Sequence, residues 1–105
     1  MMVNQPQLGM GIKDILRHQR QAIIELAARY GVSNVRVFGS VARGEATPNS
    51  DVDLLVSFPP ERIIFDLIGL WLDLKDLIGR DVSLIPDTLE NERFMQQVLK
   101  DTIPL

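Results

Sequence analysis

The feature that most restricts the fold of this chain is its regular punctuation by glycine and proline. Short β-rich segments alternate with longer amphipathic segments, and most of these segments end at one of the two residues. With 105 residues there is room for one domain with a normal core. We therefore predict a single α/β (α+β) domain in which helices pack on a small sheet.

The predicted order of elements is helix, strand, helical turn, strand, helix, strand, helix. Apolar residues at helical spacing predict a first helix over 12–30, which Gly31 ends in the position that glycine prefers. Asp87 and Glu90 have the spacing of a capping box and predict the start of the last helix. The remaining segments are strands over 32–38, 51–57 and 82–85, a helical turn over 41–45 and a helix over 61–78.

The N-terminal residues differ from the rest in composition. Residues 1–11 are rich in glycine and polar residues, which predicts a flexible arm. No repeat or linker divides the remainder, so the folded domain is predicted to be 12–105.

Composition excludes several classes of function. The chain has no cysteine, which removes disulfides, thiolate catalysis and zinc–thiolate sites. His18 is the only histidine, so a multi-histidine metal site within one chain is excluded. No apolar run is long enough to span a membrane, and no signal peptide is recognisable, so we expect a cytoplasmic protein. The net charge of −3 argues against direct binding of nucleic acid.

Two short motifs carry the chemistry. Gly39 and Ser40 end a predicted strand and open a helical turn, where free backbone N–H groups can hold phosphate oxygens. Asp51 and Asp53 begin the next strand, and alternation places both carboxylates on one face. Two such oxygen ligands suit Mg²⁺, which binds carboxylates together with substrate phosphates. This combination is what phosphoryl or nucleotidyl transfer requires.

Each motif also has a plainer interpretation. Alternating acids on a strand usually form a solvated face, and Gly-Ser is common in turns. Here, however, the two motifs lie ten residues apart and both stand at the ends of predicted strands, which favours the functional interpretation.

The spacing of Gly39-Ser40 and Asp51-x-Asp53 resembles the signature of the nucleotidyltransferase superfamily typified by DNA polymerase β. The longer run from Phe38 to Gly44 resembles the minimal nucleotidyltransferases of bacteria and archaea. The resemblance implies a small mixed β-sheet flanked by helices, and transfer of AMP from ATP with Mg²⁺. It also implies residue roles: triphosphate binding by Gly39 and Ser40, metal binding and catalysis by Asp51 and Asp53, and a phosphate or partner contact by Arg43, whose alternative is a solvated position.

The chain departs from this family at one position. The family usually carries a third carboxylate on a later strand, where this chain has Ser83. A serine is neutral and a weak metal ligand. Asp81 lies two residues earlier on the same strand face and is the candidate substitute, although it is displaced by roughly 7 Å along the strand. Its alternative role is an exposed residue beside Arg80.

The resemblance also suggests a partner. Minimal nucleotidyltransferases are commonly paired with a HEPN-domain RNase toxin, which implies an antitoxin that adds AMP to a toxin hydroxyl, on a tyrosine. Ser83 favours a second hypothesis, a binding-only antitoxin or regulator of the same fold. A third is a homodimeric enzyme that modifies small molecules.

The segment 61–78 is apolar nearly all round as a helix, so it needs cover on more than one side. Either the domain itself sandwiches this helix, or another protein covers its second side.

Overall fold

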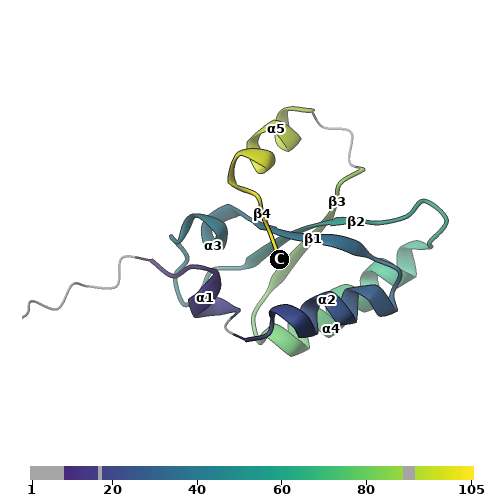
Figure 1. The fold of residues 1–105 in the computed structure, drawn as a ribbon, viewed down its shortest axis with the longest axis horizontal. Coiled ribbons are helices and arrows are strands. Elements are labelled where there is room, and N and C mark those ends of the chain that lie inside the picture. Colours follow the sequence, from purple (N-terminus) through teal and green to yellow (C-terminus); the bar gives the residue numbers. More distant parts are fainter. Residues whose placement is uncertain (1–8, 17, 89–91) are drawn as a thin grey trace, which may run out of the picture.

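A mixed four-stranded sheet forms the centre of the computed structural model, which describes residues 9–16, 18–88 and 92–105 (Figure 1). The strand order is β3-β2-β1-β4. β1 runs antiparallel to β2 and β4, whereas β2 and β3 are parallel. The mixed sheet is as predicted, but its fourth strand was not. The strands are β1 (Ser33–Phe38), β2 (Val52–Ser57), β3 (Val82–Pro86) and β4 (Ile103–Pro104).

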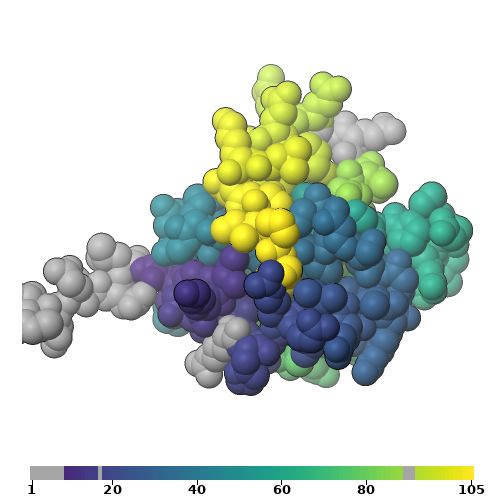
Figure 2. All heavy atoms as spheres, viewed as in Figure 1, coloured from purple at the N-terminus to yellow at the C-terminus, as the bar shows by residue number. Residues whose placement is uncertain are grey.

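Helices lie on both faces of this sheet. α2 and α4 cover one face and α5 stands over the other (Figure 1). In Figure 2, α5 and β4 form a continuous raised lobe, coloured yellow. Among the described residues, no helix has the length and apolar character needed to cross a membrane. The helices are α1 (Ile12–Ile15), α2 (Arg20–Arg29), α3 (Gly39–Arg43), α4 (Ile64–Ile78) and α5 (Glu92–Asp101).

The single helix predicted over 12–30 is wrong, because the chain breaks between α1 and α2. The break lies at Gln19, whose side-chain amide donates a hydrogen bond of 2.7 Å to the carbonyl of Leu77. This carbonyl belongs to the last turn of α4, where carbonyls lack helical partners. Gln19 therefore provides a hydrogen-bond donor for a carbonyl at the C-terminal end of α4.

The predicted start of the last helix, with Asp87 and Glu90 as a capping box, extends into residues 89–91, which lie outside the described residues. α5 begins at Glu92. The carboxylate of Asp87 accepts hydrogen bonds from Arg36 and Ser57 at 2.9 and 2.7 Å. Asp87 thus belongs to a polar cluster on the sheet. The other predicted segments appear with shifted ends: α3 covers 39–43 and α4 begins at 64.

The main core lies between the sheet and the helices α2 and α4. Strand β2 contributes alternate residues to it, and their side chains are fully buried. Leu55 is also fully buried but lies outside this core cluster, because it points toward the α5 side of the sheet. Asp53 shares that side by alternation. The largest core side chains include Leu16, Ile23, Leu54, Leu70 and Leu74.

The end of the predicted N-terminal arm touches the domain. Met10 forms an isolated β-bridge with Ala46, with N–H to carbonyl distances of 2.8 and 3.0 Å. The bridge connects the segment before α1 to the loop that precedes β2. Residues 1–8 of the arm lie outside the described residues.

Candidate active site

The centre of the candidate site is a close contact between Asp53 and the backbone of Gly39. Gly39 is the first residue of α3 and has a left-handed φ of +73°. A Cβ atom placed on it would lie 2.2 Å from Oδ2 of Asp53. Only glycine suits this position, because it tolerates both the backbone angle and the close approach. The contact brings the predicted phosphate-binding turn and one predicted metal ligand together.

The register of the sheet places three residues in a row at this point. Asp53 is opposite Phe38 of β1 and beside Ser83 of β3. Ser83 hydrogen-bonds the carboxylate of Asp53 through its side chain. The residue that replaces the third acid therefore lies next to the carboxylate, but it carries no charge.

Burial raises the pKa of Asp53 above its ordinary value, and the nearby charge of Asp51 raises it further. The hydrogen bond from Ser83 and the positive charge of Arg43 lower it, but burial dominates. Asp51 is exposed at the entry to β2. The two predicted metal ligands are therefore close enough to repel each other, and a divalent cation would relieve that repulsion.

A residue that sequence reasoning missed fixes the loop before Asp51. Nη1 of Arg80 donates hydrogen bonds of 3.1 and 3.0 Å to the carbonyls of Thr47 and Ser50. The same loop is closed by a hydrogen bond from Thr47 N–H to Oγ of Ser50, at 2.8 Å. Arg80 follows Gly79, the left-handed residue that ends α4. The only feature of the sequence that could have pointed to this role of Arg80 is its position directly after Gly79.

The predicted role of Arg43 is complicated by two acidic neighbours. Its guanidinium pairs with Glu45 at 2.8 Å and with Asp101 of α5 at 2.9 Å. These hydrogen bonds, first that to Glu45, raise the pKa of Arg43. A phosphate at this position would compete with both carboxylates for the guanidinium.

The side chain of Asp81 contacts α4 rather than Asp53. It lies just before β3, its side chain is 75% exposed, and it pairs with Lys75 of α4 at 3.6 Å. Within the described part of the chain, no group of three or more acidic or histidine side chains is placed to hold a metal ion. The structure thus brings together Gly39, Asp51 and Asp53, with Ser40 next to them in α3.

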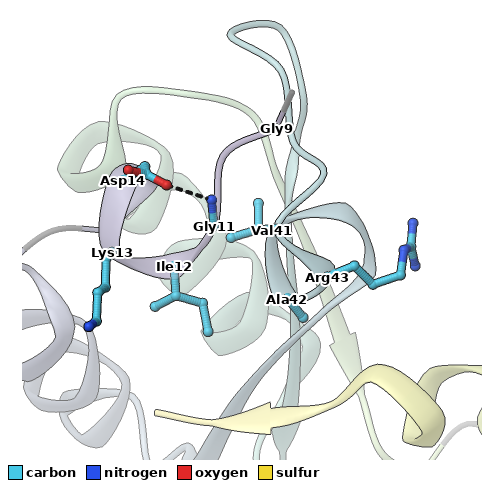
Figure 3. A pocket seen from close by; sticks show the side chains of 9 residues that line it. Gly9, Gly11, Ile12, Lys13, Asp14, Val41, Ala42 and Arg43 are labelled. Carbon is cyan, nitrogen blue, oxygen red and sulfur yellow. Dashed lines mark hydrogen bonds between the residues drawn. The ribbon is translucent and has the colours of Figure 1, made fainter. Parts of the chain in front are cut away.

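The hollow in Figure 3, of about 390 Å³, is a different place. It lies between α1 and α3, and Asp14 closes one side by accepting a 2.8 Å hydrogen bond from Gly11 N–H. Arg43 extends away from α1 (Figure 3). A smaller pocket of about 210 Å³ adjoins Gly39 from the α5 side and includes Phe94, whose ring meets that of Phe38 edge to face at 6.3 Å.

Comparison with known proteins identifies the family. A model described as "Nucleotidyltransferase domain" matches residues 19–104. The chain belongs to the nucleotidyltransferase domain family. The resemblance to minimal nucleotidyltransferases is thereby confirmed, and the prediction of a nucleotidyltransferase enzyme with it.

Two relatives and one solved complex of the same fold are similar to this nucleotidyltransferase. It is 37% identical to the protein adenylyltransferase MntA of Thermococcus cleftensis, over 75% of this chain and 80% of that one. A solved structure assigned as a minimal nucleotidyltransferase shares 45% identity and a TM-score of 0.79, over 91% of this chain and 97% of the other. A solved complex of a tri-AMPylated HEPN toxin with its MNT antitoxin, from Shewanella oneidensis, has 19% identity and a TM-score of 0.63, over 82% and 67% of the chains, and shows the shared fold.

Replacing Gly39 by alanine should destabilise the domain more than replacing Gly44. Both residues have a left-handed φ, so each alanine should cost about 1–2 kcal/mol of unfolding free energy. Only at Gly39 would the new Cβ also meet Asp53, since Gly44 has nothing within 4 Å. Urea unfolding of the two variants measures the difference. Equal losses would mean that the close contact does not exist.

Replacing Arg80 by alanine should loosen the loop that carries Asp51. The carbonyls of Thr47 and Ser50 would lose their donor, at about 1 kcal/mol each. We expect faster amide hydrogen exchange in residues 47–51, and a smaller effect in Arg80→Lys, because an ammonium can still donate. Unchanged exchange in the alanine variant would contradict this role.

Replacing Asp53 by asparagine should stabilise the domain at neutral pH. Because the pKa of Asp53 is raised in the folded state, folding holds its proton more tightly than the unfolded chain does. The free energy of unfolding therefore falls as the pH rises through the range between the ordinary and the raised pKa. An asparagine avoids this loss.

The melting temperature of Asp53→Asn should exceed that of the wild type at pH 7.5 and match it near pH 3, where the carboxyl is protonated in both states. Asp76→Asn, at an exposed position of α4, controls for the change in net charge. A lower melting temperature for Asp53→Asn at pH 7.5 would refute the assignment of a desolvated carboxylate.

Proposed function

We propose that this nucleotidyltransferase transfers AMP from ATP to a hydroxyl of a partner protein, and that the partner is a HEPN-domain toxin modified on a tyrosine. The observation that carries the proposal is the contact of Asp53 with Gly39, which joins a phosphate-binding turn to a pair of carboxylates. The names of the relatives support the class of acceptor, because one is a protein adenylyltransferase and another is an antitoxin in complex with an AMPylated HEPN toxin.

The residues present fit a magnesium ion bound together with a nucleotide. Asp51 and Asp53 supply two oxygen ligands, and Mg²⁺ in nucleotide sites commonly takes one or two carboxylates with the substrate phosphates. When bound, the ion neutralises charge that develops on the phosphates. Gly39 and Ser40 would orient the triphosphate through the backbone at the start of α3.

The reaction forms a bond between the acceptor oxygen and the α-phosphorus and breaks the bond to pyrophosphate. The proton of the acceptor hydroxyl must leave, and the chain has no carboxylate at position 83 to receive it. Asp81 pairs with Lys75 at 3.6 Å, so it would have to leave that pair to act as the proton acceptor. We therefore infer slow transfer, with water as the proton acceptor.

Ser83 also favours a second candidate function. In that case the chain would bind both the toxin and ATP but would transfer no AMP. Asp51, Asp53 and Gly39 would then serve only to bind ATP. The complex itself would then neutralise the toxin.

The intact mass of a HEPN-domain partner from the same genome, incubated with ATP and Mg²⁺, distinguishes the two functions. The enzyme adds one or more AMP units only when the chain is present, and Asp53→Asn abolishes the addition. Ser83→Asp should accelerate it at least roughly tenfold, because a general base is restored beside the site. A tight complex without any mass change would reject transfer and leave the binding-only function.

A further inference from the structure

A small pocket between α3 and α5 opens directly beside the candidate active site. It holds about 210 Å³, and Gly39 belongs to both the pocket and the site. Sites for whole small molecules usually hold roughly 300–1,000 Å³, so this pocket suits one part of a larger ligand. The proposed function places the triphosphate of ATP at the turn that Gly39 opens. The part of ATP that remains to be accommodated is its nucleoside.

Two aromatic rings form the apolar wall of the pocket. Phe38 comes from the end of β1 and Phe94 from α5, and their rings meet edge to face with centroids 6.3 Å apart. Phe94 is 37% exposed, so its contact with Phe38 leaves part of the ring uncovered. An uncovered aromatic ring beside a phosphate-binding turn can serve as a platform on which a nucleobase stacks.

The polar side chains of the pocket differ in what they can bind. Phe94, Gln97, Val98 and Asp101 follow one another at spacings of three and four residues, so they share the side of α5 that lines the pocket. Asp101 is paired with Arg43 at 2.9 Å, and the two charges offset each other. Among the described residues that line the pocket, Gln97 has the only uncharged side chain that can form hydrogen bonds. The pocket therefore suits a neutral, planar group with a polar edge.

The amide of Gln97 distinguishes between the two purine bases. An amide offers a donor and an acceptor side by side. Adenine presents the complementary pair at N6 and N7, whereas guanine presents two acceptors at O6 and N7. We propose that this pocket binds the adenine base of ATP, that Phe94 is its stacking platform and that Gln97 selects adenine over guanine. This inference rests on the proposed function, because it takes the triphosphate to lie at Gly39.

The larger hollow of about 390 Å³ between α1 and α3 is less suited to the base. No aromatic residue is found among the described residues that line it, and Gly39 is not one of them. It also contains both Lys13 and Asp14, which offer a base no apolar face. A base in this hollow would lack a stacking partner.

Equilibrium binding of nucleotides to the purified chain, with Mg²⁺ and without an acceptor protein, tests the pocket. ATP should bind at least roughly fivefold more tightly than GTP, because guanine cannot form the two-point contact with Gln97. Gln97→Arg should reverse this preference, since a guanidinium presents two donors to O6 and N7 of guanine. Gln96→Arg is the matched control: it adds the same charge at an exposed position of α5 outside the pocket, and should keep the preference for ATP.

Substitution of Phe94 tests the stacking platform separately. Phe94→Ala should weaken the binding of ATP at least roughly fivefold and leave the binding of inorganic triphosphate unchanged, because stacking acts on the base alone. Phe94→Tyr keeps the ring and should bind ATP as tightly as the wild type. Loss of ATP binding in both variants would overturn the stacking role and assign Phe94 to the packing of α5.

The remaining outcomes separate this pocket from the transfer reaction. Equal affinities for ATP, GTP and inorganic triphosphate, or no nucleotide binding at all, would overturn the base pocket. A Gln97→Arg variant that still prefers ATP would overturn the role of Gln97, whether or not the chain transfers AMP. A chain that shows the expected preferences but adds no mass to a partner protein would support the pocket and reject only the transfer step of the proposed function.

Discussion

The contact between the carboxylate of Asp53 and the backbone of Gly39 is the constraint on which the candidate site depends. It requires β1 to end at Phe38, opposite Asp53 in the antiparallel register, and it requires the chain to turn at once into α3. Glycine is needed because its φ is left-handed and a side chain would strike the carboxylate. This arrangement is unfavourable for Asp53, because its carboxylate is desolvated, has a raised pKa and lies near the charge of Asp51. A bound divalent cation and nucleotide would turn this unfavourable arrangement into a favourable one.

The two faces of the sheet divide the tasks of stability and chemistry. Strand β2 buries Val52, Leu54 and Val56 against α2 and α4, which fixes the sheet as a rigid base. The opposite face carries Asp53 and Ser83 and is partly covered by α5, which is tied to α3 through the ion pair of Arg43 with Asp101. A site built on the same strand as the core is held in place by that core. Ser83, which stands where the family resemblance implies a third acid, lies beside Asp53 in the parallel register of β2 and β3.

Sequence patterns predicted those features of the fold that depend on residues close together in the chain. Gly31 and Gly79 end helices as expected, and Gly39-Ser40 and Asp51-x-Asp53 lie at the end of β1 and the start of β2, as their positions in the sequence predicted. What the sequence could not predict depends on partners far along the chain. The break at Gln19 serves a carbonyl 58 residues away, and β4 is too short to show a pattern. In the same way, Arg80 acts on a loop 30 residues or more before it.

The proposed function requires that Asp51, Asp53 and the turn at Gly39 together bind a metal–nucleotide complex. The most direct measurement is a crystal structure with Mn²⁺ and a non-hydrolysable ATP analogue, in which anomalous scattering locates the metal. We expect a manganese peak within about 2.0–2.3 Å of oxygens of both Asp51 and Asp53, with the phosphates against Gly39 and Ser40. A nucleotide bound instead in the hollow between α1 and α3, or phosphates held without metal at the two aspartates, would contradict it.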